Sequence, residues 1–474
     1  MNSENQFILR KVVIRTVFTA IVLLGMCISV FAAEYTLDEL YKIALERSER
    51  IKISEEDVYI SEINKDKAMS FLFPKLSAVG TYTGYKDRKY SASGSQVQPD
   101  ETASWSVRLD QAVSTSGREL TALKMAKDNI EKNKMDLVSV KETYMLNVTN
   151  GYYDVLRAGK LVEISRQNIN RLKKYRDAAS IRLKIGEVTK TALLRAEAEL
   201  SGAQSDLVKA ENLLSSTRAV LQRIAGLEGS FDLYDMYKSP SSNLKNISDE
   251  SRDPLILNCP SSYLECLKDV AYVERAEFKS LTIQKDIADR QVTYTRGAHW
   301  PTLALEGVFI AKKETPETGS IIRDNVYGGV RLTLPLFEGG LRHAETQEAM
   351  AKKRQVEYAL NDLKKSIAVE VENAYLDYIA QMGILKSSGD QATFARENYN
   401  AVSKQFDFGL AQSIDVIDAN TVLVTAETQF VQALYNYQQS VAKLKRVTGM
   451  LLKSISNTTT EGKHVSTPQK KDGR

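Results

Sequence analysis

The feature that most constrains the fold is an internal repeat whose two copies keep one fixed separation along the chain. The segment Val107–Leu109 recurs as Val330–Leu332, at a separation of 330 − 107 = 223 residues. The same separation relates the later landmarks Gly117 and Gly340, Gly186 and Gly409, and Gly226 and Gly449. One inserted residue would turn every later side chain of a helix onto another face. The separation stays constant from residue 107 to residue 226 of the first copy, without an insertion or deletion. This predicts two sets of long, rigid helices.

Each copy predicts a long helix followed by a second helix with a heptad seam. The proline-free stretches 118–183 and 341–406 would each extend about 100 Å as helices. The helices that follow carry apolar or small residues spaced alternately by three and four, the pattern of a coiled coil. These seams are Leu200, Ala203, Leu207, Ala210, Leu214, Thr217, Leu221 and Ile224 in the first copy, and Leu423, Ala426, Phe430, Ala433, Tyr437, Ser440, Leu444 and Val447 in the second. Helices this long must pack lengthwise against partners.

Four short segments of another character lie between the helices. Residues 105–110, 303–309 and 328–334 alternate apolar and polar side chains, and 76–85 is a weaker segment rich in Gly, Thr and Tyr. Polar loops, 86–104 and 312–325, join them in pairs. The alternation fits the wall of a membrane barrel or an ordinary half-buried sheet. In a barrel, the row facing lipid would comprise Trp105, Val107, Leu109, Val330, Leu332 and Leu334.

A membrane location would require these strands to come from several chains. No stretch after residue 33 is apolar over the ~20 residues that a spanning helix needs. Four strands are too few to close a barrel, and hydrocarbon does not tolerate open strand edges. A trimer would contribute twelve strands, three times four.

The remaining segments are predicted to lie outside the two copies. Residues 1–33 combine basic residues, an uncharged run from 17 to 31 and small residues before Glu34, as in a cleaved secretory signal. An N-terminal anchor helix is the alternative. Residues 227–262 form a polar connector, in which Cys259 is close in sequence to Cys266; the two form a disulfide bond or stay as free thiols. Residues 453–474 are predicted to be disordered.

Composition and spacing argue against several other classes of protein. The 64 basic and 60 acidic residues are interspersed, which does not indicate nucleic-acid binding. The three histidines are scattered and far from the two cysteines, so no zinc site is expected. No Ser/His/Asp order, phosphate loop or paired-carboxylate signature occurs. We therefore expect no catalytic residue, no cofactor and no bound metal.

Three motifs resemble a known family. Trp300–Leu303 (WPTL) enters a predicted strand, Leu334–Gly340 (LPLFEGG) leaves one, and Phe408–Asp418 (FGLAQSIDVID) lies at a helix turn. Together with the order of elements, they resemble the TolC family of outer membrane efflux and secretion ducts. The resemblance extends from Tyr35 to Leu452.

The resemblance implies an α+β membrane protein that acts as a homotrimer. A twelve-stranded barrel in outer membrane lipid would continue as a tapering coiled-coil tunnel through the periplasm. There it would meet a periplasmic adaptor (membrane fusion) protein and an inner membrane pump of the RND or ABC type, which supplies the energy. Residues 34–226 would form the first structural repeat and 263–452 the second. The chain would be a passive exit duct in efflux or type I secretion; a soluble periplasmic coiled-coil scaffold is the alternative.

The resemblance also implies a pore constriction. Asp415 and Asp418 are three residues apart on one helix face. In the family, such a pair faces the pore at its narrow periplasmic end, where rings of carboxylates attract cations. The alternative is that these acids only stabilise a helix N-terminus. The polar latch that can hold the family's gate closed is missing here, because Phe406 and Ala411 occupy the positions of its aromatic hydroxyl and its basic residue. In the first copy, Ala192 occupies the position that corresponds to Asp415.

Two further sets of residues carry functional expectations. By resemblance, the helix tips around Gly186, Glu187, Gly409 and Leu410 would contact the adaptor. Each glycine also has a structural reason, since it can end a helix in the left-handed conformation. Arg108 and Arg331 lie on the polar faces of corresponding strands. They are expected to line the lumen, or to form salt bridges with neighbouring strands.

Overall fold

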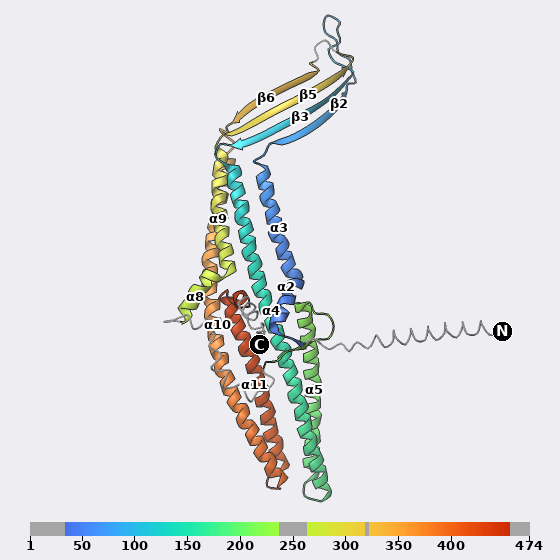
Figure 1. The fold of residues 1–474 in the computed structure, drawn as a ribbon, viewed down its shortest axis with the longest axis vertical. Coiled ribbons are helices and arrows are strands. Elements are labelled where there is room, and N and C mark those ends of the chain that lie inside the picture. The colour runs from blue at the N-terminus through green and yellow to red at the C-terminus, as the bar shows by residue number, and fades with distance from the viewer. Residues whose placement is uncertain (1–33, 237–262, 318–321, 456–474) are drawn as a thin grey trace, which may run out of the picture.

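The molecule is an elongated rod with a sheet at one end and helical tips at the other (Figure 1). The computed structural model describes residues 34–236, 263–317 and 322–455. Two helices of 67 residues, α4 (Arg118–Lys184) and α10 (Leu341–Asp407), run from the sheet to the tips. At the tips they reverse into α5 (Lys190–Ala225) and α11 (Ser413–Val447), which end near mid-length. The predicted long helices are confirmed to within one residue.

The repeat predicted from the sequence is present as a repeated order of elements. The first copy contains α3 (Glu49–Ser70), β2 (Lys75–Gly84), β3 (Glu101–Ser114), α4 and α5. The second contains α9 (Ala276–Arg296), β5 (Thr302–Thr315), β6 (Asp324–Thr333), α10 and α11. Short helices α2 (Leu37–Arg47) and α8 (Tyr263–Glu274) precede α3 and α9. A single 3-10 turn, η1 (Gly297–His299), follows α9.

Glycines mark the same helix boundaries in both copies. Gly117 and Gly340 precede the long helices with φ of 70° and 87°. Gly226 and Gly449, with φ of 66° and 72°, follow α5 and α11 closely. A residue with a Cβ atom rarely adopts this left-handed conformation, so glycine sets where each helix begins or ends. This explains why the repeat keeps its separation at these positions.

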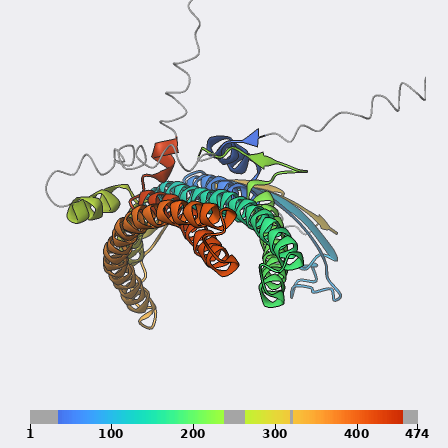
Figure 2. The same cartoon turned by 90° about the horizontal axis from the view of Figure 1, so that it is seen from below.

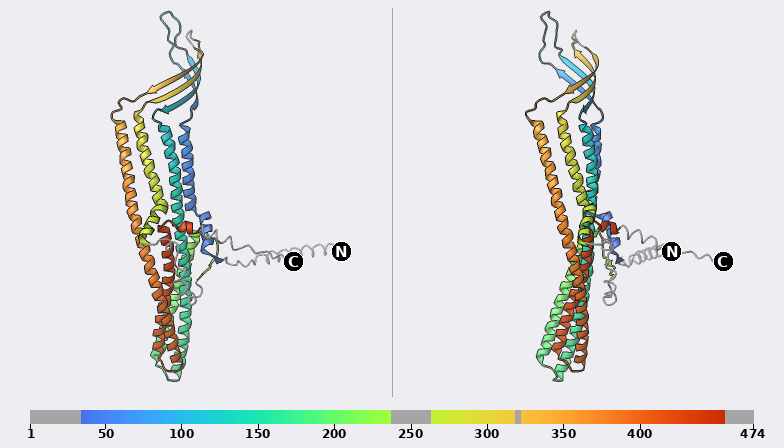
Figure 3. Two further views of the ribbon diagram at one scale, coloured as in Figure 1. Left: turned by 60° about the vertical axis from the view of Figure 1, so that its left-hand side comes forward. Right: turned by 90° about the vertical axis from the view of Figure 1, so that its left-hand side faces the viewer.

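The helices form one curved layer whose composition changes at mid-length. Between the sheet and the middle, α10, α9, α4 and α3 lie side by side in that order (Figure 3). Between the middle and the tips, the order is α10, α11, α4 and α5. Seen along the long axis the layer is curved, and the lower part of α11 lies on its concave side (Figure 2). None of the helices among the described residues combines the length and the apolar composition that crossing a bilayer requires.

The predicted heptad seams form the contact between the paired helices. All eight seam residues of α11 are buried, and those of α5 are buried or half-buried. Small residues allow close approach: a Cβ atom on Gly151 of α4 would lie 3.2 Å from Cδ1 of Leu221 in α5. The core therefore consists of seams along the rod, with one cluster around α10 and α11 and another around α2, α4 and α5.

The sheet contains four antiparallel strands in the order β2-β3-β5-β6. Among the residues that the structure describes, β2 and β6 are its two edges. The strands are longer than predicted and include residues that were predicted to lie in loops. β3 begins at Glu101, and β5 continues to Thr315. Ladder hydrogen bonds come from the backbone, so polar residues continue a strand as readily as the apolar alternation that marks its centre.

The register separates an apolar face of the sheet from a polar one. Trp105, Val107 and Leu109 are opposite Ala311, Phe309 and Gly307 and therefore share their face. The Trp105 and Phe309 ring centroids are 5.0 Å apart. Val330 and Leu332 pair with Leu305 and Leu303 on this same face, whereas Leu334 lies just beyond β6. This face is exposed in the single chain, with Val330 71% accessible.

Several expectations concern residues outside the described ranges. The predicted signal, 1–33, most of the connector and nearly all of the tail lie there. Near the middle of the rod, β1 (Glu34–Tyr35) pairs in parallel with β4 (Asp232–Leu233), which is the described start of the connector. Cys266, in α8, is disulfide-bonded. Cys259 lies outside the described residues, so a bond between the two cysteines stays a prediction.

Candidate functional site at the helical tips

Each pair of helices, α4 with α5 and α10 with α11, is joined at the tip by a tight turn centred on a left-handed glycine. Gly186 has φ of 78° and Gly409 has φ of 74°. After each glycine the backbone reaches back into the helix: the Glu187 amide donates to the Arg182 carbonyl at 2.9 Å, and the Leu410 amide to the Gln405 carbonyl at 2.8 Å. Such bonds satisfy the last carbonyls of a helix. The second tip presents two apolar side chains, Phe408 and Leu410, each 80% accessible.

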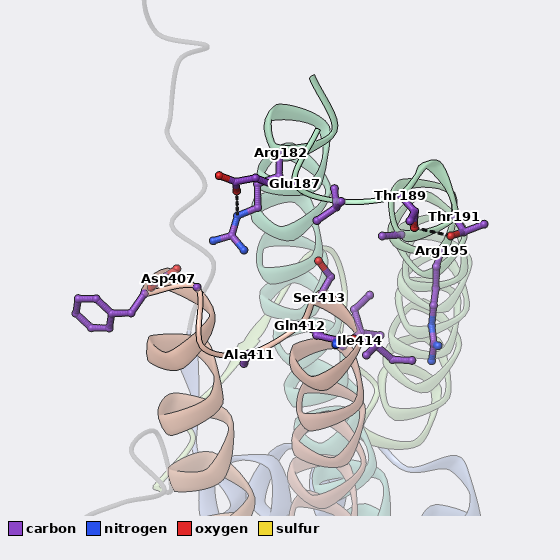
Figure 4. A pocket seen from close by; sticks show the side chains of 15 residues that line it. Arg182, Glu187, Thr189, Thr191, Arg195, Asp407, Ala411, Gln412, Ser413 and Ile414 are labelled. Carbon is purple, nitrogen blue, oxygen red and sulfur yellow. Dashed lines mark hydrogen bonds and ion pairs between the residues drawn. The ribbon is translucent and has the colours of Figure 1, made fainter. Parts of the chain in front are cut away.

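A cavity of about 970 Å³ lies between the two tips (Figure 4). Charged and hydroxyl side chains from both repeats line it, among them Arg182, Glu187, Thr191, Arg195, Asp407 and Ser413. Arg195, on α5, lies across this cavity from the start of α11. The cavity is therefore shared by the two repeats, and apolar side chains such as Val188 and Ile417 complete its lining.

The predicted carboxylates lie in the first two turns of α11. Both are exposed, because Val416 and Ile417 between them turn into the core. The Asp415 carboxylate accepts a 2.8 Å hydrogen bond from the Gln412 backbone amide at the start of the helix. The Asp418 carboxylate accepts one from the Arg195 guanidinium at 3.1 Å. The structure brings the two acids onto one exposed surface, and Asp415 in addition caps the helix.

An aromatic and arginine cluster joins the two repeats beside these acids. The Arg182 guanidinium of α4 lies 4.0 Å from the centre of the Phe406 ring of α10, and donates to the Phe406 carbonyl at 2.8 Å. Tyr175 of α4 packs edge-on against Phe406 and shares a 2.6 Å hydrogen bond with the Tyr399 hydroxyl. We call Tyr175, Arg182, Tyr399 and Phe406 the tip clamp. Val416 of α11 is buried against it.

The tip clamp and Arg195 were not expected from the sequence. In the sequence, Phe406 stands out only as a residue that lacks a latching hydroxyl. A signal was present: Arg182 and Phe406 lie about one turn before the two tip glycines, at 186 − 182 = 4 and 409 − 406 = 3 residues. Arg195 and Asp418 stand at equivalent repeat positions, since 418 − 195 = 223.

The two predicted lumen arginines share the polar face of the sheet. Arg108 pairs with Val308 and Arg331 with Ala304, so both project opposite to the apolar row. Arg108 donates to Asp110 at 2.9 Å and to Glu306 of the neighbouring strand at 2.7 Å. The salt-bridge alternative is therefore realised for Arg108. In the described part of the chain, no three His, Cys, Asp or Glu side chains are grouped so that they could hold a metal ion.

Comparison with known proteins decides the family. The family model for the outer membrane efflux protein matches the chain over residues 40–227 and again over 268–450. The chain belongs to the outer membrane efflux protein family. The two matched segments correspond to the two structural repeats, and they end close to the glycines Gly226 and Gly449.

Individual proteins of this kind are similar to the chain over most of its length and most of their own. The outer membrane protein TolC of Escherichia coli is 22% identical over 91% of this chain and 86% of its own. TolC of Vibrio cholerae is 25% identical over 66% of this chain and 69% of its own. Among solved structures, CusC superposes with a TM-score of 0.75 at 14% identity, over 88% of this chain and 93% of that one.

Family membership confirms the predicted class of function. This outer membrane efflux protein is a channel of the TolC family, a non-enzymatic exit duct of tripartite pumps. It is located in the outer membrane and extends into the periplasm. The fold of long helices with four antiparallel strands in two repeats is confirmed as well. The alternative of a soluble periplasmic scaffold does not agree with this family.

Proposed function

We propose that three copies of this chain form one continuous duct, a twelve-stranded barrel followed by a helical tunnel. The single observation that carries the trimer is the sheet, whose edge strands β2 and β6 have no partner strand among the described residues and which has one exposed apolar face. Edge strands in hydrocarbon need partners, because each unpaired backbone group there costs several kcal/mol. Pairing β6 of one copy with β2 of the next removes every edge after three copies.

The two faces of the sheet support an orientation for this barrel. The apolar row from Trp105 to Val330 faces lipid, and the face bearing Arg108 and Arg331 lines the lumen. The intrachain ion pairs of Arg108 with Asp110 and Glu306 support this assignment, because water in the lumen solvates charges that lipid would not. The repeated order of elements supports a division of the chain into two repeats, 34–226 and 263–452, linked by the connector 227–262.

The narrow end of the duct is formed by the tips, with Asp415 and Asp418 facing the pore. The concave side of the helical layer faces the tunnel axis, and α11 lies on that side (Figure 2). Three copies bring three such acidic surfaces together. Carboxylates crowded around a narrow pore favour cations over anions.

The tips themselves are the contact with a periplasmic adaptor, which links the duct to an inner membrane pump of the RND or ABC type. The exposure of Gly186, Glu187, Gly409 and Leu410 supports this contact. Phe408 and Leu410 are large apolar groups at the extreme end of the molecule, where nothing within the described part of the chain covers them. Burying such groups against a partner stabilises the complex by about 1.5–3 kcal/mol each.

The test combines assembly and conduction. Detergent-extracted protein is expected to have the mass of a trimer and to conduct ions in planar bilayers. Asp415→Ala combined with Asp418→Ala should enlarge the conductance or weaken the cation preference. Asp206→Ala, which removes an acid paired with Lys209 elsewhere on α5, is the matched control. A monomer would refute the duct, and unaltered conduction in the double variant would refute the constriction.

A further inference from the structure

We propose that Arg195 sets the ion selectivity of the duct by neutralising Asp418, so that Asp415 alone carries the effective charge of the constriction. This inference rests on the proposed function, because it assumes that Asp415 and Asp418 face the pore. It changes the expected net charge of the constriction in a trimer from −6, for six carboxylates, to −3.

The contact between Arg195 and Asp418 is direct. Nη2 of Arg195 lies 3.1 Å from Oδ1 of Asp418, and the two side chains are 45% and 64% accessible. They belong to α5 and α11, the two helices that return from the tips. The pair carries no net charge, so a passing ion several times further away than the 3.1 Å separation feels only a weak dipole where an unpaired carboxylate would present a full negative charge.

The repeat places opposite charges at one level of the duct. Arg195 and Asp418 are equivalent positions, with 418 − 195 = 223, and the equivalent of Asp415 is Ala192, with 415 − 192 = 223. In a trimer, α5 and α11 follow each other alternately around the axis. At the level of Arg195 and Asp418, three positive and three negative charges alternate and sum to zero. At the level of Asp415 and Ala192, three carboxylates alternate with three methyl groups.

The two levels therefore differ in function. The ring that contains Asp415 attracts cations and repels anions. The ring that contains Arg195 and Asp418 contributes no net charge, and its ion pairs link the two returning helices. Per chain, the net charge of these three side chains is −1 in the native protein, −2 when Arg195 is replaced, and 0 when one of the two acids is replaced.

The experiment measures the cation-to-anion permeability ratio from reversal potentials in a KCl gradient across a planar bilayer. The variants are Arg195→Gln, Asp418→Asn, the double variant with both changes, and Asp415→Asn. Each change replaces a charged side chain with a neutral polar one, and Asp→Asn also keeps the shape. Lys209→Gln, which removes an exposed cation paired with Asp206 further along α5, controls for a change in total charge. Trimer mass in detergent confirms that each variant assembles.

We expect the ratio to follow the net charge of the constriction. Arg195→Gln removes three positive charges from the trimer and makes the constriction more negative by three. In screened water this should raise the cation-to-anion permeability ratio by about two- to fivefold. Asp418→Asn and Asp415→Asn should lower it by a similar factor. The double variant should return to the native value, and Lys209→Gln should not differ from it.

The outcomes separate this inference from the function on which it rests. If Asp415→Asn lowers the ratio while Arg195→Gln leaves it at the native value, Arg195 is not a selectivity residue and the constriction still holds. If Arg195→Gln lowers the ratio, or if the double variant differs from the native protein, charge cancellation is refuted. If neither acid affects the ratio, the constriction fails and this inference fails with it.

Discussion

At the scale of single residues, the tip clamp is a contact between two long helices close to their tips. Its members come from α4 and α10, so the contact joins the first repeat to the second. Arg182 contributes both a cation over the Phe406 ring and a hydrogen bond to the Phe406 carbonyl. Contacts of this kind contribute about 0.5–2 kcal/mol. Because Val416 packs on the clamp, the clamp also orients the turn of α11 that bears Asp415.

Replacing Arg182 should loosen the tips. Arg182→Ala removes the ring contact and the carbonyl bond, so we expect a larger or more often open conductance in planar bilayers. Arg182→Lys keeps the charge but loses the planar group, and should give an intermediate effect. Arg166→Ala removes an arginine paired with Glu211 within the first repeat and serves as the control. A native conductance in Arg182→Ala would show that the clamp does not hold the tips.

A second residue makes stability depend on pH. Burial, together with the nearby Glu277 carboxylate, raises the pKa of Glu142 from 4.5 to about 7. A carboxyl whose pKa is raised in the folded state binds its proton more tightly there than in the unfolded chain. It therefore stabilises the fold at low pH, and this contribution is lost as the pH rises from about 4.5 to about 7.

We expect the thermal unfolding midpoint to fall between pH 5 and pH 8 in part through this residue. Glu142→Gln, which is neutral at every pH, should flatten that dependence and raise the stability at pH 8 by at most about 3 kcal/mol. Glu131→Gln, an exposed residue of the same helix paired with Lys134, should keep the native pH profile. Equal pH dependence in the Glu142→Gln variant and the native protein would contradict the assignment.

At the scale of elements, the spacing of α4 and α5 depends on one glycine. A Cβ atom added at Gly151 would lie 3.2 Å from Cδ1 of Leu221 in α5. A Cβ atom added at Gly159, two turns further along α4, would have no heavy atom of another element within 4 Å. Gly151→Leu should therefore separate the two helices and lower stability by roughly 1–3 kcal/mol. Gly159→Leu should cost less. Thermal unfolding followed by circular dichroism compares the two, and equal losses would contradict this packing account.

The sequence predicted the helices better than the contacts between them. The gap-free repeat and the heptad seams determine helix length and pairing, because each depends on spacing within one element. The ends of β3 and β5 were missed, since backbone pairing continues through polar residues. The tip clamp and the pair of Arg195 with Asp418 join residues more than 200 positions apart, and no local pattern encodes which long-range partners meet.

At the scale of the whole molecule, insertion into the membrane should depend on which face of a strand carries a charge. Val330→Lys puts a charge on the apolar face and is expected to cost about 2–4 kcal/mol near the bilayer centre. Tyr327 pairs with Val308 on the face of Arg108, so Tyr327→Lys should be tolerated. The amount of trimer in outer membrane fractions measures the difference. Equal amounts of both variants would refute the orientation of the barrel.

The uninterrupted length of α4 and α10 has a consequence for the cell envelope. Each helix has 67 residues at a fixed rise per residue, so its reach is fixed at about 100 Å. The distance from the outer membrane to the tips cannot adapt by stretching. In a cell whose two membranes lie further apart, the extra distance must be covered by the other components of the tripartite pump.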